Sequence, residues 1–444
     1  MAKEKSKPTV NDLLGSVISA VSTANTKGQG GGVELRTYAE RWLFDANVIR
    51  SGEIYYLPGE PAAGKSQFAA LLAAMFVRAG GAAEIIDTEH KSNASASIIP
   101  LVGEDIYFSG RFGVSTAGTI DVLEAAKKGS EEAQEEHQKS WMQMVKRRIE
   151  AIKSHPELRD IPVLLVVDSL CGATSAESRG KYEESEGSVG GKSFAGASRA
   201  AALTNWFPAV TTDIADTKIT LAFTNHVKIK INPNRPAYLP PEISFPGGEA
   251  PRFHSSTTLL FKKGGKVSKA SVGGRSVRIK VNKNSFGDDE RSLDVTFYYD
   301  MLKDANGDVV RDEHGNPMRR LKWDWDEATA TLFKKMLLSK EGGLKTVSNA
   351  AFPGLTMTKG LVQCKKLGIA DMTMTEFGRH VIRDEEIYQK LMEIPRMSIN
   401  HAPPHLVIKP DWSDLEEPSL IEGEWQAEPD DDDDEFGELD TDKV

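Results

Sequence analysis

Cysteine and long apolar runs are both scarce in this chain of 444 residues. Its two cysteines, Cys171 and Cys364, lie far apart, with no Cys or His set at metal-ligand spacing around them, which excludes a disulfide scaffold and a zinc knuckle. The longest apolar run, residues 68–77, ends at Arg78, and the N-terminal sequence MAKEKSKPTV has no apolar core after its lysines. We therefore expect no membrane span, no secretory signal and a reducing cytoplasmic compartment.

Net negative charge is absent outside the C-terminus. Residues 421–444 carry twelve acidic residues and one lysine, a net charge of −11, whereas the whole chain carries −10, so the other 420 residues sum to +1. Within this neutral body, residues 225–283 contain twelve Lys or Arg residues against two acidic ones. An acidic tail in one chain with a basic stretch predicts competition for a polyanion; a solubilising tail is the alternative interpretation.

The length predicts two or three packed units. Residues 1–32 place apolar residues at helical spacing and end in a glycine-rich joint, which predicts a helix on a flexible linker. Residues 33–300 alternate short β-rich runs with helical ones, which is typical of an α/β fold with a mostly parallel, doubly wound sheet. Within them, the charged segment 123–152 predicts a surface helix.

The last two segments are predicted to be smaller. Residues 301–402 indicate a small, mainly helical C-terminal domain, with helical patterns at 326–340, 358–367, 375–383 and 385–393. Residues 403–444 are Pro-rich and then acidic, which predicts a linker and a disordered tail.

The strongest motif is GEPAAGKS, residues 59–66, which matches the phosphate-loop pattern G-x-x-x-x-G-K-[ST] between a strand-like run and a helical one. Such a loop turns backbone N–H groups toward phosphate oxygens, and the following helix adds its positive end. Lys65 is expected to reach the β- and γ-phosphates of ATP, and Ser66 to ligate Mg²⁺; a plain glycine turn is the alternative. The expected nucleotide-binding residues are Gly59, Glu60, Pro61, Ala62, Ala63, Gly64, Lys65, Ser66 and Gln67.

Two carboxylates follow other strand-like runs. Asp168 ends the apolar run VLLVVD, which suits a residue that holds magnesium through water. Glu89 lies just past the run in AAEIIDTEH, where a carboxylate can accept a proton from water. The alternatives are a turn acid at Asp168 and a surface acid at Glu89.

A third strand-like run, ITLAFTN, ends in polar groups. Asn225 and His226 could sense a γ-phosphate there, and a structural imidazole is the alternative for His226. The segment that follows is basic and rich in Pro and Gly, and it contains Tyr238 and Phe245. Such a loop suits single-stranded nucleic acid, because cations neutralise phosphates and rings stack on bases; a plain surface loop is the alternative.

The order of these motifs resembles the RecA recombinases, in particular their phage-encoded branch typified by UvsX. The resemblance rests on GEPAAGKS, IIDTEH, VLLVVDSL, the Asn-His pair in AFTNH where bacterial RecA has Asn-Gln, and the glycine pair before RFHSS, and it covers about residues 40–300. It implies a RecA-like P-loop ATPase core that uses ATP and Mg²⁺, forms a helical filament on single-stranded DNA, and catalyses homologous pairing and strand exchange with duplex DNA.

The resemblance also implies roles for the other parts of the chain. The N-terminal helix would dock on the neighbouring subunit, single-strand-binding and mediator proteins would be further partners, and the protein would act at the DNA of a bacterial or phage-infected cell. Glu89 would be the general base and His226 the γ-phosphate sensor. Lys283, with Lys280 as the second candidate, would supply a cation to the ATP of the neighbouring subunit.

Two segments, at about 173–193 and 227–250, would be the DNA-binding loops of such a protein. The residues expected to contact DNA in or beside them are Arg179, Lys181, Lys192, Lys228, Lys230, Arg235, Tyr238, Phe245 and Arg252.

The chain departs from the family pattern at two places. Ser285 stands where relatives commonly have a second basic residue, and Asn93 and Ala96 stand where bacterial relatives have an Asp and an adenine-stacking Tyr. Two other functions stay open. The string KNSFG at 283–287 resembles that of RadA-type motors and favours a ring-forming helicase or branch-migration motor. A regulatory ATPase indifferent to DNA is the second alternative.

Overall fold

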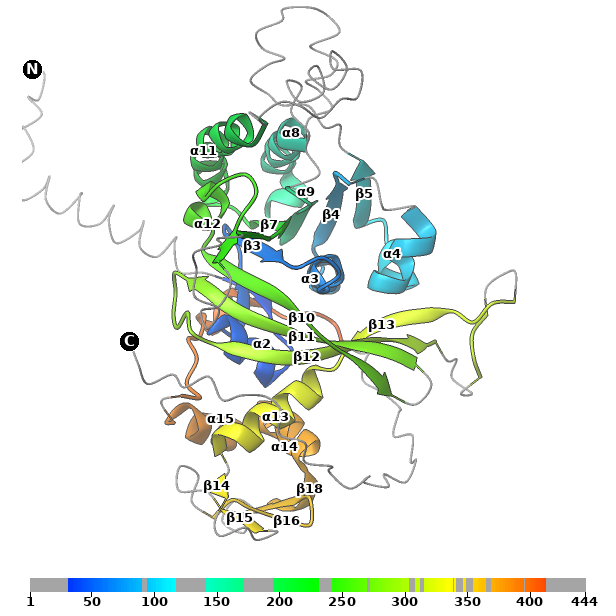
Figure 1. Cartoon of the computed structure of the whole chain (residues 1–444), viewed down its shortest axis with the longest axis vertical. Helices are drawn as coiled ribbons and strands as arrows, with labels where there is room; N and C mark the ends of the chain where they lie inside the picture. Colours follow the sequence, from blue (N-terminus) through cyan, green and yellow to red (C-terminus); the bar gives the residue numbers. More distant parts are fainter. Residues whose placement is uncertain are drawn as a thin grey trace, which may run out of the picture. The chain divides into compact units, whose positions relative to one another are not determined.

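The computed structural model describes residues 31–89, 94–116, 141–170, 195–230, 242–269, 272–302, 308–311, 315–337, 339–340, 346–348, 354–364, 369–394 and 396–412. The chain divides into two compact units, Met1–Pro410 and Asp411–Val444. In the second unit the structure describes residues 411 and 412, so the elements named below belong to the first (Figure 1).

A nine-stranded sheet forms the centre of this unit. In spatial order its strands are β13 (Arg319–Trp323), β12 (Ser292–Met301), β11 (Val272–Asn284), β10 (Thr257–Lys269), β3 (Ile54–Gly59), β7 (Ile219–His226), β6 (Val163–Asp168), β4 (Ala82–Asp87) and β5 (Phe112–Thr116). The strands from β10 to β5 are parallel, and β10 to β13 are antiparallel. The mostly parallel sheet of an α/β protein is therefore confirmed.

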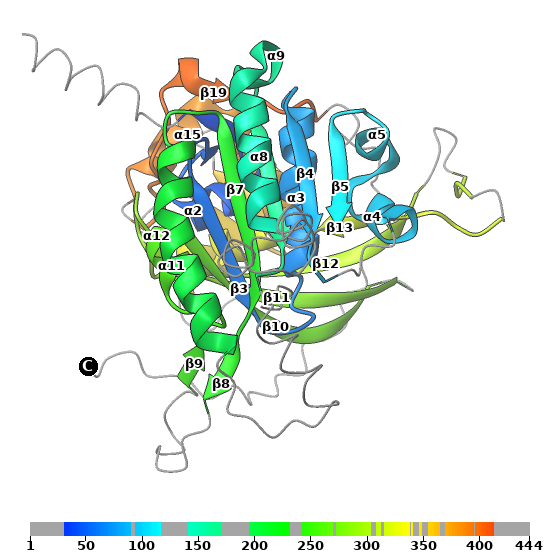
Figure 2. The same ribbon diagram turned by 90° about the horizontal axis from the view of Figure 1, so that it is seen from above.

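Helices cover both faces of the parallel strands. On one face, α8 (Trp141–Ser154) and α11 (Ala195–Ile214) share an apolar core with alternate strand residues such as Leu165 and Val167. On the other, α3 (Lys65–Arg78) packs against β3, β4, β6 and β7 and carries α4 (Ala94–Val102) and α5 (Glu104–Tyr107) beside it. Figures 1 and 2 show this arrangement, which is that of a doubly wound sheet.

A small sheet attaches the end of the first unit to its beginning. In it β1 (Gly32–Glu34) lies between β2 (Val48–Arg50) and β19 (Val407–Ile408). Beside it, α2 (Tyr38–Phe44) begins with a capping box between Thr37 and Glu40. The shorter elements are α9 (Pro156–Arg159), α12 (Ala250–His254), the 3₁₀-helix η2 (Pro404–Leu406), and the paired strands β8 (Lys228–Lys230) and β9 (Glu242–Ser244).

The C-terminal region contains more strand than the sequence predicts. The helix expected at 358–367 is wrong, because β16 (Thr356–Thr358) and β17 (Leu361–Cys364) form a hairpin there. Lys359 and Gly360 at its turn both have positive φ, the conformation of a tight two-residue hairpin turn. The hairpin belongs to a five-stranded antiparallel sheet with β14 (Ser339–Lys340), β15 (Thr346–Ser348) and β18 (Ile369–Thr373).

The other helices expected in this region are present. They are α13 (Trp325–Leu337), α14 (Met374–Arg383) and α15 (Glu385–Met392); α13 ends three residues before the predicted boundary. The predicted surface helix is confirmed from Trp141 onward as α8. The expected N-terminal helix, at residues 10–24, and the acidic tail lie outside the described residues. Among the described helices, none is long and apolar enough to cross a membrane.

Candidate nucleotide site

The phosphate loop joins β3 to α3, as the motif predicts. Gly64 adopts φ 82°, a backbone conformation that glycine reaches without strain, and α3 begins at the next residue, Lys65. The first turn of α3 contains no acidic residue. The positive N-terminal end of this helix is therefore not offset by a carboxylate of its own first turn.

The Lys65 side chain lies inside the loop. It is 6% exposed, and its Nζ donates to the carbonyl oxygens of Gly59 at 3.1 Å and Glu60 at 2.6 Å. The N–H of Ala63 also donates to the Glu60 oxygen, at 3.3 Å. Two donors of the loop thus converge on one carbonyl oxygen of the loop itself, and donors held in this way are available to an anion that replaces that oxygen.

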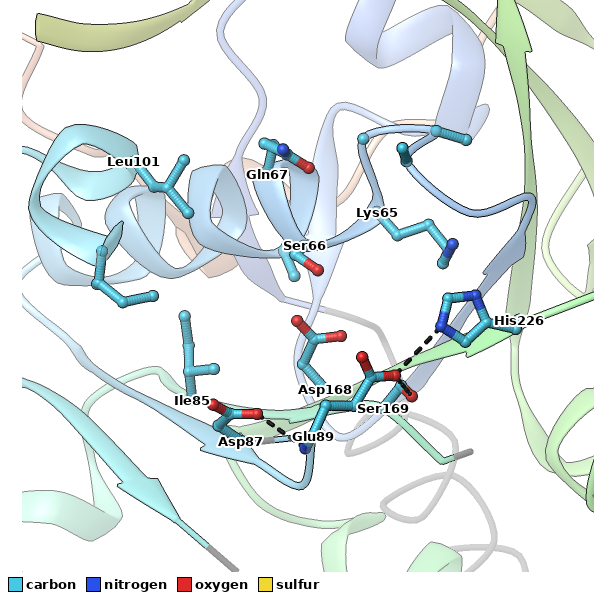
Figure 3. A pocket seen from close by; sticks show the side chains of 15 residues that line it. Lys65, Ser66, Gln67, Ile85, Asp87, Glu89, Leu101, Asp168, Ser169 and His226 are labelled. Carbon is cyan, nitrogen blue, oxygen red and sulfur yellow. Dashed lines mark hydrogen bonds and ion pairs between the residues drawn. The ribbon is translucent and has the colours of Figure 1, made fainter. Parts of the chain in front are cut away.

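A cavity of about 350 Å³ opens beside the loop (Figure 3). The register of the parallel strands explains how its polar residues come together: Gly59 at the end of β3 lies opposite His226 of β7, and Asp87 of β4 lies opposite Asp168 of β6. The carboxyl ends of the strands therefore meet at one edge, as they do at ligand sites of doubly wound sheets. The structure brings the predicted Lys65, Ser66, Asp168, Glu89 and His226 together around this cavity.

Asp168 has an environment that disfavours its charged form. Burial raises the pKa of the Asp168 carboxyl, and the neighbouring carboxylates of Glu89 and Asp87 raise it further. Hydrogen bonds from the hydroxyls of Ser66 and Thr224 act in the opposite direction. A cation bound here would stabilise the carboxylate, because an opposite charge favours the ionised form.

Glu89 is held by three neighbours at the other wall of the cavity. Its Oε1 accepts a hydrogen bond from the Ser169 hydroxyl and lies 3.2 Å from Nε2 of His226. Its backbone N–H donates to Oδ1 of Asp87 at 2.9 Å (Figure 3). The predicted base and the predicted sensor are therefore in direct contact.

His226 and Asn225 connect the cavity to the segment after β7. Nδ1 of His226 is buried with no hydrogen-bond partner in the part of the chain that the structure describes. Asn225 is fully buried, and its Nδ2 donates to the Tyr56 hydroxyl at 2.7 Å and to the Pro246 carbonyl at 2.9 Å. Pro246 lies just after β9, so Asn225 attaches the end of the predicted second DNA loop to the strand that carries His226.

Three residues of the site were not predicted as functional. Asp87 orients the Glu89 backbone, Ser169 holds the Glu89 carboxylate, and Thr224 donates to Asp168. Each lies at or just past the end of a predicted strand, next to a residue that was predicted. Their position at the ends of predicted strands could therefore have identified them as site residues. Which residue each of them binds depends on the fold and could not have been predicted from the sequence.

Lys283 lies away from the cavity of its own chain. Lys283 is on β11, where it lies opposite Thr258 of β10 near the amino end of the parallel strands. Its Nζ donates to the carbonyl oxygens of Arg252, Phe253 and Ser255. Burial lowers the pKa of this ammonium group. A role at the ATP of another subunit stays a prediction, as it does for Lys280, which is exposed on the same strand.

The predicted DNA-contacting residues are described in part. Lys228 is exposed on β8, and Lys230 pairs with Glu242 through the main chain. Arg252 lies on α12 and forms an ion pair with Glu249 at 3.5 Å. Phe245 packs edge-on against Tyr56, with ring centroids 5.9 Å apart, so this ring is attached to the core. The remaining ones, Arg179, Lys181, Lys192, Arg235 and Tyr238, lie outside the described residues.

The donor set suits a magnesium ion held together with phosphate. Oxygen atoms of Ser66 and Asp168 lie within hydrogen-bonding reach of each other, and hydroxyl and carboxylate oxygens are ligands that Mg²⁺ takes alongside phosphates and water. Among the described residues, no group of three or more His, Cys, Asp or Glu is placed to hold a metal by itself.

No protein-family model matches the chain, and no curated protein matches it either.

Proposed function

We propose that this chain is an ATP-dependent DNA recombinase with a RecA-like P-loop ATPase core. In this proposal it forms filaments on single-stranded DNA and pairs that strand with homologous duplex DNA. The observation that carries the proposal is the convergence of Lys65, Ser66, Asp168, Glu89 and His226 around one cavity at the carboxyl edge of the sheet. This set combines a phosphate-binding loop, oxygen donors for Mg²⁺, a carboxylate base and a polar sensor.

The phosphate loop would bind the triphosphate. Lys65 would exchange its bonds to the loop carbonyls for bonds to the β- and γ-phosphates, and the N-terminal end of α3 would add its partial positive charge. Ser66 would ligate Mg²⁺ directly, and Asp168 would hold it through water. When bound, the ion would neutralise charge on the phosphates.

Hydrolysis would depend on Glu89. Its carboxylate would accept a proton from the attacking water, while Ser169 and the Asp87-bound backbone keep it oriented. In the present arrangement His226 contacts the same carboxylate oxygen. If the imidazole turned to the γ-phosphate, it would leave Glu89 available for water and register that a triphosphate is bound.

DNA binding would respond to nucleotide through the segment after β7. His226 ends β7, β8 with the exposed Lys228 follows it, and Asn225 attaches the far end of the segment to the same strand. A displacement of His226 would therefore reach both ends of the predicted second DNA loop. Cations in this loop would neutralise DNA phosphates.

Electron microscopy with a non-hydrolysable ATP analogue, with and without single-stranded DNA, tests the proposal. Helical filaments that form with DNA and the analogue are expected. Closed rings would instead favour the helicase or branch-migration motor. Dispersed particles under every condition, together with ATP hydrolysis indifferent to DNA, would contradict the recombinase and favour a regulatory ATPase.

A further inference from the structure

The antiparallel hairpin of β10 and β11 contacts the outside of the phosphate loop. Glu60 Oε2 accepts a hydrogen bond from the main-chain N–H of Lys263 in β10 at 2.9 Å. Two residues further along the loop, the Ala62 carbonyl accepts a hydrogen bond from Nη1 of Arg275 in β11 at 3.0 Å. Two successive strands thus hold two alternate residues of the loop, and neither Lys263 nor Arg275 lines the cavity.

The next strand extends this support. A Cβ atom added at Gly64 would lie 2.9 Å from the ring of Phe297 in β12, so the loop and this ring are in close contact. Arg275 is the direct cross-strand partner of Phe297. Because directly opposite residues of neighbouring strands share a face, Arg275 and the ring both face the loop.

Arg275 holds a peptide group that is strained and that points into the site. Ala62 has φ 57°, which is uncommon for a residue with a side chain and persists only where neighbouring contacts maintain it. In a planar trans peptide the C=O of Ala62 and the N–H of Ala63 point in opposite directions. A guanidinium that fixes the carbonyl on the outside therefore aims the Ala63 N–H into the loop, where it now donates to the Glu60 oxygen.

The alternation of side chains along β11 explains why Arg275 faces the loop, because it lies on the same face of the strand as the buried Val277 and Ile279. The neighbouring strand is irregular beside it. The pairing of β10 with β11 shifts register between Lys263 and Lys266, at Gly264 and Gly265. Such a bulge bends β10, the strand whose Lys263 contacts Glu60. Glycine is required because a Cβ at Gly264 would lie 2.7 Å from the main-chain oxygen of Ser276.

We propose that Arg275 is a positioning residue of the nucleotide site. It does not line the cavity, and it acts through the Ala62–Ala63 peptide, whose carbonyl it binds. With the carbonyl held in this way, the Ala63 N–H stays directed into the loop, where it would donate to a phosphate oxygen of the nucleotide in place of the Glu60 carbonyl. The inference depends on the proposed nucleotide binding, and it adds that the affinity for phosphate is set in part by a strand outside the phosphate-loop motif.

Equilibrium binding of a fluorescent ATP analogue to the full chain tests this role. Arg275→Met should raise the Kd about tenfold, the usual effect of losing a hydrogen bond from a charged donor. Hydrolysis at saturating ATP should change much less than the Kd, because the guanidinium does not touch the reacting atoms. Arg275→Lys, which keeps a cationic donor, should recover most of the lost affinity.

Arg278→Met is the matched control. Arg278 lies on the same strand and forms a bidentate pair with Asp294 instead of contacting the loop, so its loss should leave the Kd unchanged. An unchanged Kd in Arg275→Met, or equal losses in the Met and Lys variants while both keep the wild-type melting temperature, would overturn the positioning role and leave the proposed function standing. Failure of the wild-type chain to bind nucleotide would overturn the proposed function itself.

Discussion

The two edges of the parallel strands hold charged side chains in different ways. At the amino edge, Arg291 and Asp45 form an ion pair at 3.0 Å with both side chains 7% exposed. Arg291 also donates to the Trp42 and Ser398 carbonyls, and Asp45 accepts from Asn400. At the carboxyl edge, Asp168 lies near two other carboxylates, and burial raises its pKa.

The difference separates a structural charge cluster from a binding one. At the amino edge, Arg291 and Asp45 neutralise each other's charge and find their hydrogen-bond partners within the chain. The pair connects the segment around residue 400 to the core. The carboxyl-edge carboxylates and the loop donors have an arrangement that a cation and an anion would stabilise further. We therefore expect substitutions at the amino edge to change stability and substitutions at the carboxyl edge to change activity.

The largest effect is expected at Lys65. Lys65→Ala removes the cation of the phosphate loop, so ATP affinity should fall about 10³-fold, by analogy with loss of a buried charged partner, and strand exchange should stop. Isothermal titration calorimetry and a strand-exchange assay measure the two outcomes. Strand exchange at the wild-type rate would contradict the account of the site.

Arg291 should show the opposite pattern. Arg291→Met leaves Asp45 buried without its cation, which should lower the free energy of unfolding by about 3 kcal/mol. Arg278→Met removes an exposed pair and should cost less than about 1 kcal/mol. Urea unfolding compares the variants. Equal losses of unfolding free energy in Arg291→Met and Arg278→Met would contradict the distinction between the two edges. A large loss of ATP affinity in folded Arg291→Met would contradict it as well.

Glu89→Gln should separate binding from chemistry. The amide cannot accept the proton from water, so hydrolysis should slow by about 10² or more while ATP binding persists. Glu84→Gln is the control, because Glu84 lies on β4, the strand that leads to Glu89, and pairs with Arg148 outside the cavity. Wild-type turnover in Glu89→Gln would remove this residue from the role of base.

The smallest effect is expected at the exposed Lys228. Lys228→Ala should lower affinity for single-stranded DNA a few-fold and reduce the slope of log affinity against log salt by about 0.7, the value for one phosphate contact on a single strand. Fluorescence anisotropy across a salt series measures both. An unchanged slope would mean that this lysine faces solvent in the complex.

The sequence was most informative where a local pattern determines the structure. GEPAAGKS predicts its own loop, and the polar ends of three apolar runs predict Asp168, Glu89 and His226, because parallel strands end at a common edge. The hairpin at Thr356–Cys364 differs from the predicted helix because so short a run of mixed apolar and polar residues suits both a helix and a strand. The contact between Arg275 and Ala62 joins residues more than 200 positions apart, and no local pattern contains it.

In the proposed function, a triphosphate bound at the carboxyl edge increases the affinity of the protein for single-stranded DNA. The most direct measurement is the affinity of a labelled oligonucleotide for the protein without nucleotide, with ADP and with a non-hydrolysable ATP analogue. We predict tight binding with the analogue and weak binding in the other two states. Equal affinity in all three would contradict the claim.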